Sequence, residues 1–307
     1  MKEKMVNESR VAGYLYDHKL ERKVTGSKSK NPGTEYLRGT ISIATDDSCM
    51  NVVKVAFVYV VSTYKDKKGA EHPNQTFGYL GDIIDGKIKT VVNDGKENAA
   101  IVICNGNLNL VDYPSRQNPD EMISFLQNES RFINFASQTF QDFGADFRTD
   151  MLITNVKHNE ADEEKNIKEH VVVKGCIFDW QVNPLPVSFK VYHPGAIEYF
   201  EDLELPCFTQ VRGKQVSSTQ RIEHKEANAW GEEEITYSTR SVRDFVITGA
   251  KPEPYGIDEE STGKNLTFKE IKELQARRER RLAEIKQTYE EYQNAATESN
   301  DTPEFQF

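Results

Sequence analysis

Short runs rich in Val, Ile and Tyr, separated by Gly, Asn, Asp and Pro, occupy most of the sequence between residues 39 and 250. This pattern is typical of β-strands joined by turns, so it restricts the chain to a mainly β fold. The runs of the first half are GTISIATDD (39–47), NVVKVAFVYVVSTY (51–64), NAAIVICNGNLNLVDY (98–113) and DMLITNVKH (150–158). Those of the second half are EHVVVKGCIFDW, PVSFKVYH, PCFTQVRGKQVSSTQRI and EITYSTRSVRDFVITGA.

Two stretches interrupt the β pattern. NPDEMISFLQNESRFINFASQTF (118–140) is polar, and we expect it to be helical or irregular. NEADEEKN (159–166) is strongly acidic and is interpreted as a linker or a long hairpin tip.

The two β-rich halves resemble each other faintly. GTISI followed by VAFVY in the first half is similar to GCIFD followed by VSFKV in the second, and each half continues to a strand with a central glycine, Gly106 or Gly213. Two copies of one β module would explain this echo, and chance recurrence would explain it equally well.

Each half holds about five candidate strands, and a long first strand in each contains a glycine where a small barrel bends sharply. These features favour the five-stranded OB barrel over a β-sandwich, because a seven-stranded sandwich needs more strands than each half supplies.

The C-terminal region differs from the rest. LTFKEIKELQARRERRLAEIKQTYEEYQNAA (266–296) contains no glycine or proline and opens with a capping box formed by Thr267 and Glu270. Its apolar residues follow a 3-4 spacing, which predicts one amphipathic helix of about seven turns. A helix this long is expected to pack along a barrel or to pair with a second copy.

We therefore predict five parts: a first OB-like β domain at 1–158, an acidic linker at 159–169, a second OB-like module at 170–255, a C-terminal helix at 266–296 and a disordered acidic tail at 297–307. No run reaches the apolar length of a membrane span and the charged start is unlike a signal peptide, so we expect a cytoplasmic protein.

Residues suited to catalysis do not gather in any recognisable motif. STGKN (261–265) fails as a phosphate loop, because Asp258 stands where the first glycine belongs and Asn265 follows the lysine. The six histidines are scattered, and the four cysteines, Cys49, Cys104, Cys176 and Cys207, show neither disulfide nor zinc spacing. We predict a protein that is not an enzyme and needs no cofactor or metal.

The net charge of the chain is -10, but basic and acidic residues are concentrated in different segments. Residues 19–38 carry six basic residues against two acids, whereas residues 160–169 carry five acids against two lysines. Binding of single-stranded nucleic acid needs cations for phosphates and flat rings for bases, and both occur in VAFVYVVSTYKDKKGAEHPNQTFGYLG (55–81).

Phe57 and Tyr59 share strand parity, so we expect both rings on one face, with Tyr79 contributed by the returning strand. The alternative, in which Phe57 is core and the lysines form an ordinary hairpin tip, stays open. The candidate DNA contacts are Lys28, Lys30, Arg38, Phe57, Tyr59, Tyr64, Lys65, Lys67, Lys68 and Tyr79.

The ending TESNDTPEFQF resembles that of single-stranded DNA-binding proteins from bacterial and phage replisomes, in which an acidic tail closing on an aromatic residue follows an OB domain. The resemblance implies that Asp301, Glu304, Phe305 and Phe307 recruit replication or recombination partners, and that the tail competes with DNA for the basic groove. This tail is less acidic than the family pattern, and Gln306 separates its two rings.

The leading hypothesis is a phage-type single-stranded DNA-binding protein that forms homo-oligomers through its C-terminal helix. The first alternative is a virion structural or assembly protein, built from β-sandwich modules with an oligomerising helix. A nuclease whose acidic clusters bind metal is a weaker alternative, because those acids lie in linker-like sequence.

Overall fold

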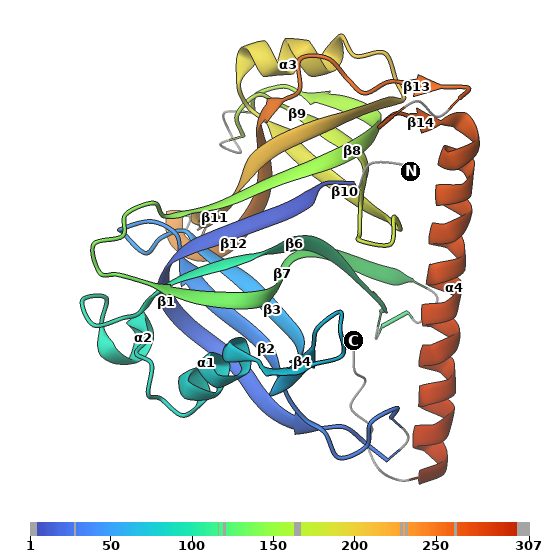
Figure 1. Cartoon of the computed structure of the whole chain (residues 1–307). Helices are drawn as coiled ribbons and strands as arrows, with labels where there is room; N and C mark the ends of the chain where they lie inside the picture. The colour runs from blue at the N-terminus through green and yellow to red at the C-terminus, as the bar shows by residue number, and fades with distance from the viewer. Residues whose placement is uncertain are drawn as a thin grey trace.

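The computed structural model describes residues 5–27, 29–115, 117–118, 121–162, 167–227, 230, 233–260 and 263–299. Of residues 218–227, 233–234, 237–242 and 292–299 it describes the backbone alone. The described chain forms two β barrels, one above the other in Figure 1, with a long helix beside them.

Five strands close the first barrel: β1 (Asn7–Val24), β2 (Glu35–Ala44), β3 (Val52–Val61), β6 (Ile101–Pro114) and β7 (Met122–Ala136). Their order is β1-β2-β3-β7-β6, and β6 pairs back onto β1. All pairs are antiparallel except β3 with β7. Helices α1 (Gln75–Ile84) and α2 (Val91–Asp94) lie between β3 and β6 in the chain, and Leu80 and Ile83 of α1 are buried in the barrel core.

The second barrel repeats this topology with β8 (Gly144–Asn159), β9 (His170–Phe178), β10 (Pro184–Val191), β11 (Cys207–Ala227) and β12 (Glu233–Ala250). Its order is β8-β9-β10-β12-β11, with β11 pairing back onto β8 and a parallel pair of β10 with β12. Helix α3 (Pro194–Glu201) occupies the place of α1 and α2 in the chain.

Irregularities of register recur at matching places in the two barrels. On the fourth strand, Gly106 and Gly213 each lie where the fifth strand carries one extra residue. A Cβ would lie 1.9 Å from the carbonyl oxygen of Glu129 at Gly106, and 2.2 Å from that of Val246 at Gly213. Only glycine permits this close approach of two backbones.

The first strands carry matching bulges as well. Tyr16 is the extra residue of β1 opposite β2, and Thr154 is the extra residue of β8 opposite β9. Ser9 pairs with Gly106 as Phe147 pairs with Gly213, which sets the correspondence between the two first strands. Two five-stranded barrels with one strand order and matching bulges on the first and fifth strands are two copies of an OB module.

The similarity between the two halves of the sequence therefore identified strands that correspond in the two barrels. It did not align the residues of those strands correctly. The segments beginning at Gly39 and Gly175 lie on β2 and β9, yet pairing makes Ile43, not Gly39, the counterpart of Gly175. Similar apolar alternation on one strand type produces this kind of slip.

The two barrels are joined by an antiparallel ladder between their first strands. Residues 7–12 of β1 pair with residues 144–149 of β8, and the corresponding residues Ser9 and Phe147 face each other at its centre. Glu8 pairs with Arg148, at 2.7 Å between carboxylate and guanidinium, and Arg10 pairs with Asp146, at 3.9 Å. These two ion pairs correspond to each other, so the ladder has a pseudo-two-fold axis through its centre.

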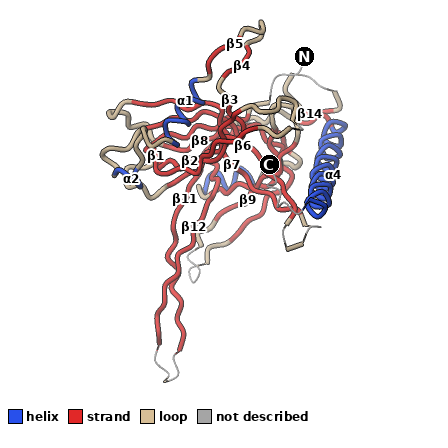
Figure 2. The backbone as a smooth tube through the Cα atoms, turned by 90° about the horizontal axis from the view of Figure 1, so that it is seen from below, coloured by secondary structure: helices blue, strands red, loops and turns tan. Residues whose placement is uncertain are grey.

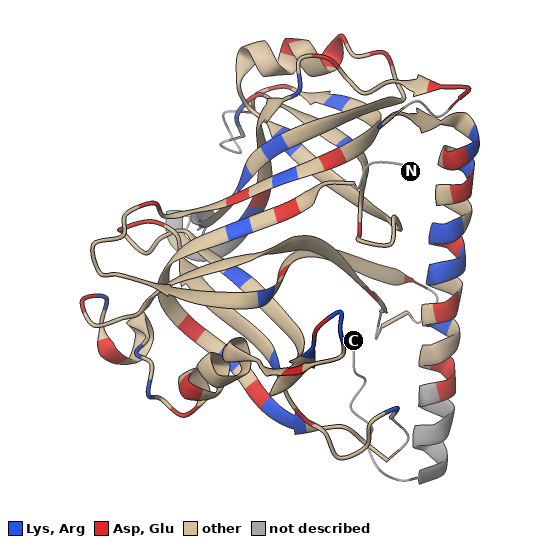
Figure 3. Ribbon diagram, in the orientation of Figure 1, with Lys and Arg blue, Asp and Glu red and all other residues tan. Residues whose placement is uncertain are grey.

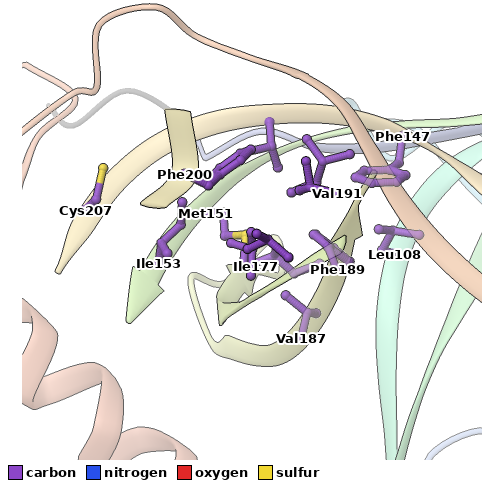
Figure 4. Packing of buried hydrophobic residues seen from close by; sticks show 14 of the residues in the cluster. Leu108, Phe147, Met151, Ile153, Ile177, Val187, Phe189, Val191, Phe200 and Cys207 are labelled. Atoms are coloured by element: carbon purple, nitrogen blue, oxygen red, sulfur yellow. The ribbon is translucent and has the colours of Figure 1, made fainter. Parts of the chain in front are cut away.

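Each fourth-to-fifth strand hairpin reaches into the neighbouring barrel. Leu108 and Leu110 of β6 are buried in the core of the second barrel, where Figure 4 shows Leu108 beside Phe189. Reciprocally, Gln215 of β11 accepts a hydrogen bond from the amide of Asn128 on β7. By register, Asn128 and Gln215 correspond to Phe245 and Leu108, and those two lie in the second core.

Helix α4 (Phe268–Ser299) runs alongside both barrels (Figure 1). The predicted capping box is confirmed: the amide N–H groups of Glu270 and Thr267 donate to the Thr267 hydroxyl and the Glu270 carboxylate, respectively. A two-stranded ribbon of β13 (Ile257–Asp258) and β14 (Leu266–Thr267) leads into it. Arg278 donates two hydrogen bonds to the buried carboxylate of Asp112 on β6, which fastens the helix to the first barrel.

Three expectations from the sequence differ from the structure. Residues 122–136 of the stretch expected to be helical or irregular form strand β7, because alternate side chains such as Leu126, Asn128 and Ser130 turn inward. QTFGYLGDII, expected as a returning strand, is helix α1, with the Asn74 side chain accepting a hydrogen bond from the N–H of Thr76 as its N-cap. Residues 144–159 form β8 of the second barrel, so the 159–169 segment spans the tip of the β8–β9 hairpin, not a boundary between domains.

Two hairpins extend from the barrels. The short ribbon of β4 (Thr63–Lys65) and β5 (Glu71–Pro73) and the long arm of β11 and β12 project in opposite directions in Figure 2. Within the described ranges, no helix has the combination of length and apolar character needed to cross a bilayer.

We predict that Gly106→Ala and Gly213→Ala each destabilise the protein by about 1–3 kcal/mol or more, because the new Cβ would overlap a carbonyl oxygen. Urea unfolding followed by circular dichroism measures this. Gly26→Ala is the control, since a Cβ at Gly26 meets no atom within 4 Å. Equal stability of all three variants would contradict the matched close approaches.

Candidate nucleic-acid interface

Strand β3 places one predicted ring inside the barrel and the other outside. Opposite Leu37 to Gly39, the β3 strand carries an extra residue, so Val58 and Tyr59 both face outward. Phe57 is 1% exposed in the core, whereas Tyr59 is 49% exposed, with its ring centroid 4.8 Å from that of Tyr36. The expectation that Phe57 and Tyr59 share a face is wrong, because a bulge reverses the alternation of a strand.

The β4–β5 hairpin continues the same chain outward. Asp66 orders its tip by accepting hydrogen bonds from the N–H groups of Lys68 and Ala70 and from the His72 ring. The bond to His72, followed by those from the backbone, lowers the pKa of Asp66. The three predicted lysines are exposed, and no carboxylate of the described residues forms an ion pair with them: Lys65, Lys67 and Lys68.

Tyr64 stands beside these lysines. Its ring is 53% exposed and lies 5.5 Å from the His72 imidazole, with an angle of 33° between the two planes. One face of Tyr64 is thereby supported by a second ring, and the other side chains of β4 are exposed. A flat ring held in this way is a platform on which a base can stack.

Three of the six cations of the basic segment 19–38 form ion pairs with carboxylates of the same chain. Arg38 donates to Glu21 at 2.6 Å, Lys23 lies 3.5 Å from Glu21, and Arg22 donates to Asp85 at 2.6 Å. Lys30 is exposed in the β1–β2 connection, and Lys28 lies outside the described residues. Arg38 was thus predicted as a DNA contact, but it is committed to a carboxylate of its own chain.

A group of cations not singled out from the sequence lies on the outer face of the first barrel. Lys19 of β1 and Lys54 of β3 are exposed on adjacent rows of the sheet, and Arg243 comes from β12 of the second barrel. Burial, followed by the positive charges of Arg243 and Lys19, lowers the pKa of Lys54, while Asp17 raises it. Three like charges brought so close indicate a surface suited to a polyanion.

The second barrel carries a comparable face. Lys157 corresponds to Lys19, because each lies three residues beyond the bulge of its first strand. Lys174 of β9 is exposed on the next row, and no ion pair with it or with Lys157 occurs in the described part of the chain. Lys190, by contrast, lies 2.8 Å from Asp244.

Strand β7 supplies further exposed rings that the helical or irregular expectation for this segment concealed. Phe125 is 45% and Phe132 is 62% exposed. Tyr79, predicted on a paired strand, lies on α1, where its ring packs edge-on against Phe135 at 5.0 Å. That position is a packing contact rather than the free platform expected.

The remaining predicted partner-binding residues, Asp301, Glu304, Phe305 and Phe307, lie outside the described residues. The described part of the chain contains no group of three His, Cys, Asp or Glu side chains that could hold a metal ion. The four cysteines are free thiols, and burial raises the pKa of Cys176 to about 12. Strong thiol nucleophiles have lowered pKa values instead.

A signal for part of this surface was present in the sequence. Lys54 and Lys174 each interrupt a valine-rich strand, NVVKVAFV and HVVVKGCI, and a lysine within such a strand marks its outer face. Nothing local marks Arg243, because only the path of the β11–β12 arm brings it to the first barrel.

Two OB barrels joined through their first strands, with unpaired lysines and exposed rings on the outside, define a tandem OB-fold protein. The chain belongs to the YorF family, whose sequence model matches residues 5–288. No curated protein sequence matches it.

Two solved structures of the single-stranded DNA binding protein from Thermus aquaticus are similar to this chain. A deletion mutant has a TM-score of 0.48 and 11% identity, and the alignment covers 84% of this chain and 99% of that chain. The wild-type protein has a TM-score of 0.46 and 11% identity, with 84% and 98% covered.

We predict that Arg243→Ala raises the pKa of Lys54 toward the ordinary lysine value of about 10.4, because a neighbouring positive charge that favours neutral Lys54 is removed. An NMR pH titration of the labelled lysine side chains measures this. Arg212→Ala, on the same hairpin, is the control and should leave the Lys54 titration unchanged. An unaltered Lys54 pKa in Arg243→Ala would place Arg243 away from this face.

Proposed function

We propose that the protein binds single-stranded DNA without catalysing a reaction. The observation that carries this proposal is the set of unpaired cations and exposed rings on one segment of the chain, which runs from Lys54 and Tyr59 of β3 to Tyr64 of β4 and the lysines of the β4–β5 hairpin. The chain has a net charge of -10, so unpaired lysines gathered near exposed rings stand out against its acidic composition.

The physical basis is counterion release combined with stacking. Each lysine that neutralises a phosphate releases a condensed cation, which favours binding at low salt. Tyr59 and Tyr64 offer ring faces to which any base can stack, so little sequence preference is expected. The hairpin holds its lysines beyond the barrel, where a flexible strand reaches them without rearranging the core (Figure 2).

The tail and the helix take secondary roles in this proposal. Asp301, Glu304, Phe305 and Phe307 would recruit replication or recombination proteins, as the family resemblance of the ending implies. Helix α4 would serve for self-association only through the surface that its contacts with β6, β10 and β14 leave uncovered. In Figure 3 this helix is densely charged along its described length.

The alternative of a virion protein requires β-sandwich modules, and the described strands do not form them. Each set of five strands closes on itself through β1–β6 or β8–β11 pairing, and does not form two stacked sheets. The long helix of that alternative is bound to its own chain through Arg278 and Asp112.

We predict that affinity for oligo-dT falls steeply with salt, and that Lys65→Ala/Lys67→Ala/Lys68→Ala weakens it. Loss of three phosphate contacts should reduce the slope of log K against log salt by about 2. Fluorescence anisotropy at several salt concentrations measures both effects, with the melting temperature as a check of folding.

The matched control is Lys89→Ala/Lys269→Ala/Lys272→Ala, which removes the same charge from exposed lysines of the α1–α2 connection and the start of α4. If the control lowers the slope equally, net charge alone governs binding. No binding of oligo-dT at low salt would refute the proposed function.

We expect Tyr59→Ala and Tyr64→Ala each to weaken binding by about 1–3 kcal/mol, because each would lose a stacked base. Tyr59→Phe and Tyr64→Phe keep the ring and should bind nearly as the unmodified protein does. Folded alanine variants with unchanged affinity would move the site to the second barrel, near Trp180, Tyr192 and Arg212, where Trp180 is 73% exposed.

A further inference from the structure

The lysine faces of the two barrels are related by the ladder that joins them. Lys19 and Lys157 occupy corresponding positions on β1 and β8. The second lysine of each face lies on the adjacent row of its own sheet, as Lys54 of β3 or as Lys174 of β9. Lys54 lies on the third strand of its barrel and Lys174 on the second strand of its own, which is a lateral difference of about 5 Å between the two faces.

The pseudo-two-fold axis stands perpendicular to this ladder. Corresponding residues, Ser9 and Phe147, lie directly opposite each other on antiparallel strands, and a half-turn about a line normal to the sheet between them exchanges the strands. The ion pairs of Arg148 with Glu8 and of Arg10 with Asp146 exchange under the same half-turn.

Both barrels lie on the same side of the ladder. Leu15 of β1 points into the first core and its counterpart Ile153 of β8 points into the second core. A half-turn about the normal leaves the inner and outer sides of the sheet unchanged. Along the ladder, the outward sides of β1 and β8 therefore lie on the same face of the molecule, and Lys19 and Lys157 follow on the outward sides of these strands beyond the bulges.

A nucleic acid strand has a direction, and a half-turn about an axis perpendicular to it reverses that direction. We propose that the two barrels hold single-strand segments of opposite direction, so that a continuous strand occupying both barrels turns back between them. This inference rests on the proposed function and adds the relative direction of its two binding faces.

Differences between the two barrels affect the affinity for single-stranded DNA more than the direction of the bound strand. The β4–β5 hairpin with its three lysines belongs to the first barrel, and the corresponding connection of the second runs from β10 into α3 with Pro194 at its start. The first face is therefore expected to bind more tightly. Strand direction is set by the backbone frame of each barrel, which the matched bulges and pairings make alike.

The test measures direction in each barrel separately, using the full chain. Lys157→Ala/Lys174→Ala leaves the first face, and Lys19→Ala/Lys54→Ala combined with Lys65→Ala/Lys67→Ala/Lys68→Ala leaves the second. An acceptor dye is attached at the tip of the corresponding first hairpin, through Ser27→Cys or Ala161→Cys, both exposed sites. Energy transfer is then recorded from a short oligo-dT with a donor at its 5′ or its 3′ end.

Selective labelling is feasible because three of the native cysteines lie in strands, and burial raises their thiol pKa. Cys49, in the β2–β3 turn with φ of 56°, is replaced by Asn, which tolerates this conformation. Second labels at Ser48→Cys or Gln181→Cys, in the corresponding turns at the far ends of the same sheets, should report the opposite DNA end.

The expected result is that the same DNA end, 5′ or 3′, gives the higher transfer to Ser27→Cys on the first face and to Ala161→Cys on the second. Opposite ends in the two barrels, or equal transfer from both ends, would overturn the inference. So would loss of all binding in the variant that lacks these five lysines of the first barrel while the unmodified protein binds. If the unmodified protein binds no oligo-dT, the proposed function itself fails.

Discussion

The ladder between β1 and β8 is the contact on which the rest of the structure depends. The first half of β1 lies between β6 of its own barrel and β8 of the other, so one strand supplies backbone hydrogen bonds to both modules. The pairing fixes the barrels in one relative position, and only in that position do Leu108 and Leu110 reach the second core and Gln215 reach Asn128. Helix α4 then spans both barrels and is bound at the first by Arg278.

Much of the fold was predictable from the sequence, because strands and the C-terminal helix depend on local patterns. Valine-rich runs and the Thr267–Glu270 capping box act over a few residues and were recognised correctly. The boundary between the two modules was not recognised, because the sequence of β8 resembles that of any other strand. Only its pairing with β9 and β11 assigns β8 to the second barrel. Strand β7 was missed because its inward positions include Asn128 and Ser130, which are polar residues buried through hydrogen bonds.

In the candidate site, too, the features set by local sequence were predicted and those set by strand pairing were not. Exposure of the lysines in the β4–β5 hairpin follows from turn chemistry at Asp66 and Gly69, so the sequence located them. The outward position of Tyr59, away from the side of Phe57, depends on a bulge in β3, and Arg38 is paired with Glu21 on the neighbouring strand β1. Composition reveals neither feature. Tyr79 was misplaced because a helix was taken for a strand.

Because the two modules belong to one chain, their sequences need not be identical. In a dimer of identical subunits, any substitution beside the axis appears twice, so a residue there must suit both of its copies. Here the same two corresponding positions hold a hydrogen-bonded amide pair, Asn128 with Gln215, on one side and the apolar residues Phe245 and Leu108 on the other. Covalent fusion thus permits each half to evolve separately, so that one side of the junction specialises in a dry core while the other retains a polar contact.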